Sequence, residues 1–312
     1  FRIPLHYFNT FPNRCAVITQ SMARWSACGS LLLLLVGAVM SSSSVVRADT
    51  TPRRMSNVEL AAWRRKHLFT FQPGSGPAPA VDDTFAAELN AAARGQGVPD
   101  AVNWVTRGGV TAVGAQGMCG TIAFAITGTV EGVNFAMNHR LVSLSAQEVL
   151  ACSTPDGCNW GGYPSDSLHW FASNTNGWIC TNASDPYESF DGVSPSTCAL
   201  NCTKGTRFDA VVNLPHSEAA IEQAVAINGP VAVMLDATSW CGYDGGVFDR
   251  CTFESLTHAV TVVGYNNTHR PPYWLVKNSW GSGFGENGYI RIEKGTNQCG
   301  INKMPTTVRI RR

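Results

Sequence analysis

The sequence predicts an α+β protein in which a mainly helical subdomain and a mainly β subdomain enclose a cleft. Two observations lead to this prediction. From Val98 the composition becomes globular, and the first part of that region holds long apolar segments suited to buried helices. The later part consists of short runs rich in β-branched and aromatic residues, separated by Gly, Pro and Asn. Helices followed by strands are typical of α+β proteins, and sites tend to lie in clefts between subdomains. We therefore expect a helical part over 98–204 and a β part over 205–312.

Four segments are expected to form helices. Residues 84–95 read TFAAELNAAARG and end at a glycine suited to a helix C-terminus. Residues 121–138 carry apolar side chains densely enough for a helix that is buried on most of its surface. Residues 145–151 and 165–173 are the two shorter candidates.

Five runs in the second half are expected to be strands. They are GPVAVMLDA (229–237), HAVTVVGY (258–265), YWLVKNSW (273–280), GYIRIEKG (288–295) and TTVRIR (306–311).

The N-terminal region is expected to be separate from this domain. We treat residues 1–21 as an uncertain extension and residues 22–48 as a signal peptide, because an arginine precedes an apolar run and small residues lead to Ala48. The apolar run is short for a stable membrane span. Residues 49–97 contain a Pro/Gly-rich stretch at 72–80 and are expected to be a short linker or degenerate pro-region.

Cysteine usage fits a secretory protein. The chain has 11 cysteines, of which Cys15 and Cys28 precede the expected cleavage point. An oxidised framework is the natural interpretation of the rest in a secreted chain. A metal site is disfavoured, because no Cys-x-x-Cys pair with matching histidines occurs. Sequons for glycosylation occur at Asn182, Asn201 and Asn266.

The charge balance limits the partners. Net charge is +1, and residues 98–312 carry more acidic than basic side chains. We therefore expect no nucleic-acid partner, and neither a cofactor nor a metal. Nothing in the sequence predicts an oligomeric state.

Three segments contain residue types suited to nucleophilic catalysis. His258 stands beside an apolar run, and Asn278 lies in VKNSWG, where Trp280 follows it. A histidine base needs a group that fixes its tautomer, and an asparagine screened by an aromatic ring can do this. His258 alone fits a plain core histidine better than a catalytic one, but together with KNSWG at this spacing it favours a site. QGMCGTIAF (116–124) resembles a nucleophile loop that leads into a helix.

Residues 98–312 resemble the papain family of cysteine peptidases, and within it the cathepsin L-like lysosomal enzymes of kinetoplastid protozoa. The segments that carry the resemblance occur in the family's order. They are VPDAVNW, GGVTAVGAQGMCG, LVSLSAQEVLAC, GCNWGGYP, GPVAVMLDATSW, GYDGGVF, THAVTVVGY and PPYWLVKNSWGSGFGENGYIRIEKGTNQC. The resemblance implies a papain-like fold, with a helical subdomain and an antiparallel β-barrel subdomain on either side of a peptide-binding cleft.

The resemblance also assigns roles. It implies that Gln116 helps to form the oxyanion hole, that His258 is the base, that Asn278 orients it and that Trp280 covers the pair. The residues implied in substrate binding are Gly161, Gly162, Tyr163, Pro164, Met234, Leu256, Ala259 and Met304, with Trp280 on the primed side. The implied disulfides are Cys119–Cys158, Cys152–Cys198 and Cys251–Cys299, with Cys180–Cys202 as a possible fourth, which leaves Cys241 outside these pairs.

The nucleophile itself is missing. The family's motif is Gln-Gly-x-Cys-Gly-Ser-Cys-Trp-Ala-Phe, and the matching segment of this chain, QGMCGTIAF, is one residue shorter. A one-residue slip would turn each helical side chain by about 100°, so the helix sets the register and Thr121 takes the nucleophile's place. Counting from the loop places Ile122 there instead, and neither register supplies a cysteine. We expect Thr121 to act as the helix N-cap.

These observations predict a papain-like homologue with impaired activity that keeps a cleft for a peptide or protein ligand. One alternative is an endopeptidase that uses Thr121 or another nucleophile. Another is a structural or surface glycoprotein on a peptidase fold. A secretory location is expected in each case, either a lysosome-like compartment or the cell exterior.

Overall fold

The computed structural model describes residues 80–311 apart from 155–157, 159–161, 194–196 and 199. The expected extension (1–21), the signal peptide (22–48) and residues 49–79 of the linker lie outside the described residues, as does Gly161.

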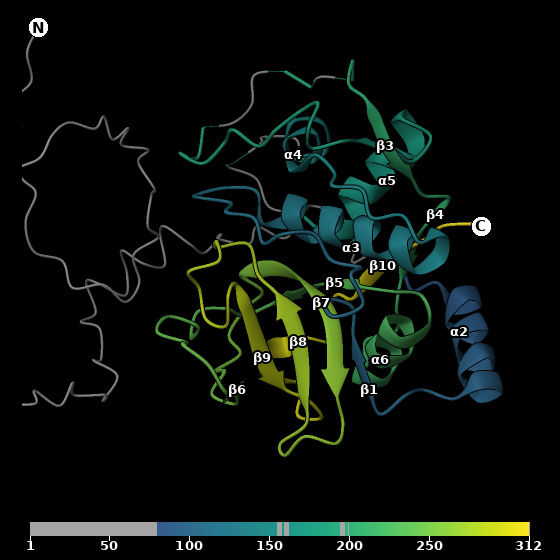
Figure 1. Ribbon diagram of the computed structural model, residues 1–312, viewed down its shortest axis with the longest axis vertical. Helices are drawn as coiled ribbons and strands as arrows, with labels where there is room; N and C mark the ends of the chain where they lie inside the picture. The colour runs from purple at the N-terminus through teal and green to yellow at the C-terminus, as the bar shows by residue number, and fades with distance from the viewer. Residues whose placement is uncertain (1–79, 155–157, 159–161, 194–196, 199, 312) are drawn as a thin grey trace, which may run out of the picture.

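The first half of the domain is built around one central helix. Helix α3 (Thr121–Asn138) has the predicted bounds, and most of its side chains are buried. Helices α4 (Ala146–Ser153) and α5 (Pro164–Asn174) pack against it, each within two residues of its predicted ends. Figure 1 shows α3 crossing the middle of the molecule, between these helices and the sheet.

The second half contains the predicted sheet. Strands β5 (Val231–Leu235), β7 (His258–Asn266), β8 (Tyr273–Lys277), β9 (Tyr289–Glu293) and β10 (Thr306–Arg309) all fall within predicted runs or one residue beyond them. The strand order is β4-β10-β5-β7-β8-β9-β6, and β1 pairs with β7. All pairs are antiparallel except β6 with β9, which is parallel. The result is a helical layer against a mostly antiparallel sheet, which confirms the α+β prediction.

Several short elements were not predicted. They are β1 (Ala101–Asn103), β2 (Trp178–Cys180), β3 (Lys204–Arg207), β4 (Ala210–Asn213), β6 (Val247–Phe248) and α6 (Glu218–Ile227). Strands of two to four residues are too short to show a period in the sequence. β2 and β3 form a separate sheet of two strands.

Helix α2 (Asp83–Gln96) packs against α6, and Figure 1 shows the two helices side by side at the right of the molecule. Phe85 and Leu89 of α2 are buried in the core beneath it. The predicted glycine cap at Gly95 is wrong by two positions. The helix continues to Gln96 and ends at Gly97, whose φ of 76° is left-handed.

The two halves meet where α3 lies along β7. A side chain at Gly128 would bring its Cβ to 2.9 Å from Thr261 Oγ1, so glycine permits this close contact. The apolar cluster around α3 also includes Ala232, Met234 and Ala259 from β5 and β7. This packing places the first residue of α3 beside the first residue of β7.

Disulfide bonds join Cys119 to Cys158, Cys152 to Cys198, Cys180 to Cys202 and Cys251 to Cys299. Three of these are the pairs that the family resemblance implied, and Cys180–Cys202 is the additional pair that was suggested as a fourth. Across the described part of the chain, no helix combines the length and the hydrophobicity needed to cross a bilayer.

Candidate active site

Thr121 is the first residue of α3 and faces strand β7. Its Oγ1 lies 2.7 Å from His258 Nδ1. The same oxygen lies 2.9 Å from the carbonyl oxygen of Ala259 and accepts the Ala259 N–H at 3.0 Å. The expectation that Thr121 caps α3 is wrong. The N-cap is Gly120, whose φ of 84° is left-handed, and the cap makes no side-chain hydrogen bond. The Thr121 oxygen is therefore bonded across to the sheet and not to its own helix.

His258 and Asn278 come together at the ends of adjacent strands. His258 opens β7, and Asn278 directly follows β8. Asn278 Oδ1 lies 2.8 Å from His258 Nε2 and also accepts the Ser279 N–H at 2.8 Å. Because this oxygen is an acceptor, Nε2 carries the imidazole proton, and the lone pair of Nδ1 faces Thr121. This is the tautomer that a general base requires.

Two tryptophans enclose the imidazole. The Trp280 ring centroid lies 4.8 Å from that of His258, and the Trp240 centroid lies 5.9 Å away at an interplanar angle of 89°. His258 is buried, as is Asn278. Trp280 was expected here, whereas Trp240 was missed because no pattern in the sequence marks a ring that arrives from a neighbouring loop.

Gln116 is fixed by residues that the sequence did not point to. Its backbone N–H donates to the Ser279 carbonyl oxygen at 2.7 Å, and Ser279 Oγ donates to Gln116 Oε1 at 2.6 Å. This bond directs the amide so that its N–H groups remain for another acceptor. The Tyr187 hydroxyl contacts the carbonyl oxygens of Gln116 and Cys119, at 2.9 and 3.0 Å. Burial raises the pKa of Tyr187, so its hydroxyl stays a donor.

Most of the residues implied in substrate binding gather in one apolar cluster. Met234 and Ala259 are buried in it, and partly buried side chains pack against them, namely Tyr163, Leu256 and Met304. Pro164 is buried as the first residue of α5. Gly162 has open space where a side chain would be. Of the sequon asparagines, Asn201 is exposed, whereas Asn182 and Asn266 are half-buried.

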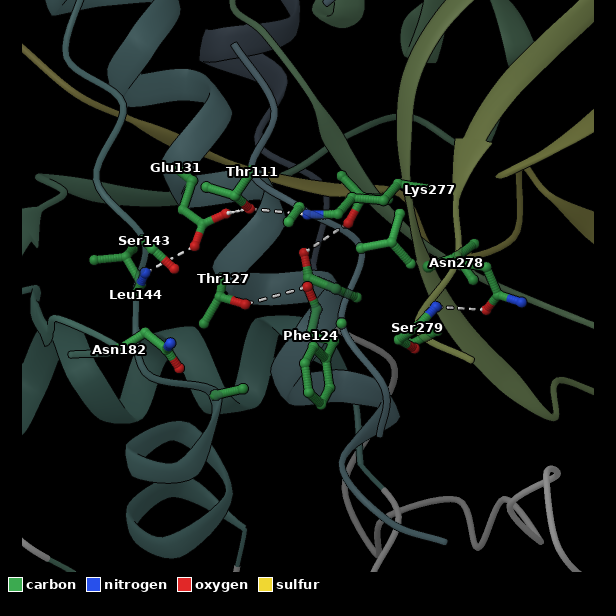
Figure 2. A pocket seen from close by; sticks show the side chains of 18 residues that line it. Thr111, Phe124, Thr127, Glu131, Ser143, Leu144, Asn182, Lys277, Asn278 and Ser279 are labelled. Atoms are coloured by element: carbon green, nitrogen blue, oxygen red, sulfur yellow. Dashed lines mark hydrogen bonds between the residues drawn. The ribbon is translucent and has the colours of Figure 1, made fainter. Parts of the chain in front are cut away.

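A cavity of about 230 Å³ lies behind the site, between α3 and strands β7 and β8. Figure 2 shows a chain of hydrogen bonds inside it. Lys277 Nζ donates to Thr111 Oγ1 at 2.9 Å, and that hydroxyl donates to Glu131 Oε2 at 2.6 Å. Burial raises the pKa of Glu131 and lowers that of Lys277, and each charge partly offsets the other's shift. Asn278 and Ser279 line this cavity, but Thr121 and His258 do not.

Within the described residues, the group that could hold a metal ion is Glu148 with Cys180 and Cys202. Its two sulfurs form a disulfide in this structure. They therefore do not offer the thiolates that bind zinc.

The site brings together the His258 imidazole, the Asn278 amide that is hydrogen-bonded to it and the Gln116 amide, and the Thr121 hydroxyl faces the imidazole. A thiol has a pKa of about 8.5 that a helix N-terminus and an imidazolium lower further, so a thiolate forms before substrate arrives. A hydroxyl must lose its proton during the reaction. The geometry therefore permits proton transfer to His258 without a resting ion pair.

Comparisons with known proteins identify a family and relatives for this chain. The model of a family described as papain family cysteine protease matches residues 98–309. Cysteine proteinase A of Leishmania mexicana is 44% identical over 211 residues, which cover 67% of this chain and 59% of that protein. A cysteine proteinase of Trypanosoma brucei brucei is 45% identical over 208 residues, or 66% and 46% of the two chains. Cathepsin S of Bos taurus is 40% identical over 221 residues, or 68% and 65%. The chain thus spans 46% to 65% of the length of these curated relatives.

Solved structures are similar as well. The recombinant stem bromelain precursor has a TM-score of 0.67 at 29% identity, covering 81% of this chain and 80% of that one. The proform of Amb a 11, titled a cysteine protease and a major ragweed pollen allergen, has a TM-score of 0.65 at 30% identity, covering 76% and 72%.

Proposed function

The chain belongs to the papain family of cysteine peptidases, and from this premise and the geometry of the site we propose that it binds peptides with its hydrolytic activity lost or strongly impaired. The observation that carries the proposal is the position of Thr121 Oγ1, which bonds to both the N–H and the C=O of Ala259. The oxygen is part of the backbone hydrogen-bond pattern at the start of β7.

The strand pairing explains why the oxygen is held there. The ladder between β7 and β8 begins at Thr261, so Ala259 has no partner from β8. Thr121 supplies the donor and the acceptor that a neighbouring strand would otherwise give. A buried backbone group without a partner costs about 1–3 kcal/mol. Moving the hydroxyl toward a substrate therefore costs the hydrogen bonds to the Ala259 backbone. A thiolate has no proton to donate to the Ala259 carbonyl oxygen, so it would not lose that bond on attack.

The surrounding residues support a retained ligand site. His258 and Asn278 keep their hydrogen bond, and the side-chain carbonyl of Gln116 is held by Ser279. The apolar cluster that includes Met234, Leu256 and Met304 is suited to Leu, Phe or Val in a bound peptide. Oxidised cysteines support an oxidising compartment such as the secretory pathway, and we propose a lysosome-like or extracellular site of action.

The second candidate is hydrolysis through Thr121. It is favoured by the 2.7 Å distance between Thr121 Oγ1 and His258 Nδ1, which is within reach for general-base catalysis. In this case both Thr121→Val and His258→Ala would abolish an activity that the unaltered protein possesses.

A hydrolysis assay separates the two. The purified protein is tested with a fluorogenic peptide that carries Phe before the scissile residue, alongside Thr121→Cys, Thr121→Val and His258→Ala. We expect the unaltered protein to turn over no faster than His258→Ala and to bind a non-hydrolysable peptide of the same sequence in calorimetry. We expect Thr121→Cys to gain activity. Turnover by the unaltered protein at least about tenfold above both Thr121→Val and His258→Ala would establish the hydrolase instead.

A further inference from the structure

Residues 181–193, here named the brace segment, lie against the loop that leads into α3. The Tyr187 hydroxyl contacts the carbonyl oxygens of Gln116 and Cys119. The Met118 N–H donates to the Phe190 carbonyl oxygen at 3.1 Å. The brace segment therefore helps to hold the loop that carries Gln116. The brace segment starts directly after Cys180, which forms a disulfide with Cys202, two residues before β3.

A buried carboxyl group lies against this disulfide. Glu148 Oε1 is 3.0 Å from Cys180 Sγ and 3.9 Å from Cys202 Sγ. Glu148 Oε2 accepts the Cys180 N–H at 2.7 Å. Cys180 is buried, whereas Cys202 is half-buried, so a reductant reaches the Cys202 sulfur first. Cys180 would then be the sulfur that leaves, next to the carboxyl group.

The surroundings of Glu148 favour its protonated form. The pKa of Glu148 is raised to about 7, chiefly by burial; the bond from the Cys180 N–H opposes the rise, and the nearby Asp185 carboxylate contributes to it. α4 packs against α3, α5 and β2. The other titratable side chains on those three elements are Glu131, Asp166 and His169. None of these three shifts the pKa of Glu148, so its protonation follows burial and Asp185.

We propose that Glu148 is a proton donor built into the Cys180–Cys202 disulfide, so that a dithiol opens this bond more readily in acid than at neutral pH and loosens the brace segment. The reductant's thiolate attacks Cys202 Sγ, forming a mixed disulfide and breaking the bond to Cys180. The departing Cys180 sulfur takes the electron pair and the Glu148 proton. The second thiol of the reductant then loses its proton to water and attacks the reductant's own sulfur in the mixed disulfide; Cys202 leaves as a thiolate and takes a proton from water. The dithiol becomes a cyclic disulfide, and Glu148 regains a proton from solvent.

The proton transfer is favourable on chemical grounds. A thiol has a reference pKa of about 8.5, above that of the Glu148 carboxyl, so the departing thiolate is the stronger base. When Glu148 is ionised, the same departure places two negative charges about 3 Å apart in a buried site, which strongly disfavours it. Leaving-group stabilisation is one of the factors that set the rate of thiol–disulfide exchange.

The test compares two disulfides within one molecule, because the thiolate fraction of any dithiol itself depends on pH. The protein is treated with a low-pKa dithiol between about pH 5.5 and pH 8.5, quenched by alkylation and mapped by mass spectrometry. Cys152–Cys198, whose Cys198 is exposed, is the internal reference. We expect the opening rate of Cys180–Cys202 relative to that reference to fall at least about tenfold across this range.

Two variants sharpen the result. Glu148→Gln should make the ratio independent of pH, whereas Glu188→Gln, which alters an exposed carboxylate of the brace segment, should behave as the unaltered protein. Amide exchange at Met118 should accelerate once the bond is open and in Cys202→Ser. A pH-independent ratio in the unaltered protein overturns the proposal, even if Glu148→Gln does not fold. So does equal pH dependence in Glu148→Gln, or unchanged Met118 protection after opening.

Discussion

Replacing Thr121 with valine tests whether its oxygen is committed to structure. Valine has nearly the same shape, so the change leaves no cavity and removes only the hydroxyl. The Ala259 N–H and C=O, now bonded to that oxygen at 3.0 and 2.9 Å, would lose their partner in a buried place. Two orphaned backbone groups at about 1–3 kcal/mol each, with partial relaxation, give a loss of about 2–4 kcal/mol in the free energy of unfolding.

The assay is equilibrium unfolding in urea, followed by tryptophan fluorescence, with Thr121→Ser as the matched control. Serine keeps the hydroxyl and should cost less than about 1 kcal/mol. In thermal unfolding the valine variant should melt roughly 5–15 °C lower. If valine and serine are equally stable, the hydroxyl is not held by the Ala259 backbone. The structural argument for an impaired nucleophile would then fail, whatever the peptidase assay gives.

Three further predictions test other parts of the structure. Because burial raises the pKa of Glu148 from 4.5 to about 7, the folded protein loses stability as pH rises through that window. In urea unfolding, Glu148→Gln should therefore match the unaltered protein near pH 4.5 and be more stable by about 1–3 kcal/mol at about pH 8. The opposite trend would contradict the burial of this carboxyl group. Thr111→Val removes the hydroxyl between Lys277 and Glu131 and should lower the free energy of unfolding by about 1–3 kcal/mol in the same measurement. An unchanged free energy would show that these buried hydrogen bonds do not stabilise the fold. Leu89→Ala should cost about 2–4 kcal/mol and make α2 sensitive to limited proteolysis, unlike the exposed control Asn90→Ala, and equal protease resistance would show that α2 is not anchored through Leu89.

The sequence predicted the elements that are long or buried on a regular pattern. Helix α3 and strand β7 were located closely because each carries a dense set of apolar residues. Helix α6 was missed although EAAIEQAVAI is a good helix sequence, because the second half of the domain was treated as consisting of strands throughout. Strands such as β6, with two residues, exist only through pairing with a distant partner, which no local pattern records.

The same distinction holds for the site. His258 and Asn278, whose side chains the structure brings within hydrogen-bond distance, were singled out because each lies in a motif of several residues. Ser279 was overlooked although it is in the same motif, since its role depends on a bond to Gln116 that is 163 positions away. The orientation of Thr121 was mispredicted for a related reason. N-cap preference is a local property of the sequence, whereas the lack of a β8 partner for the Ala259 backbone arises only in the assembled sheet.

The position of the Thr121 proton gives the proposed impairment a second cause besides the low acidity of the hydroxyl. The hydroxyl has one proton, and two acceptors face it, His258 Nδ1 at 2.7 Å and the Ala259 carbonyl oxygen at 2.9 Å. If the proton points to His258, as catalysis requires, the Ala259 oxygen loses its donor. If it points to Ala259, the base has nothing to abstract. A thiolate avoids this competition because its proton already resides on the imidazole. Each 1.36 kcal/mol spent on breaking the structural bond lowers the rate about tenfold, in addition to the penalty for a poorly acidic oxygen. The bonds that make Thr121 useful to the fold are thus the ones that oppose its use as a nucleophile.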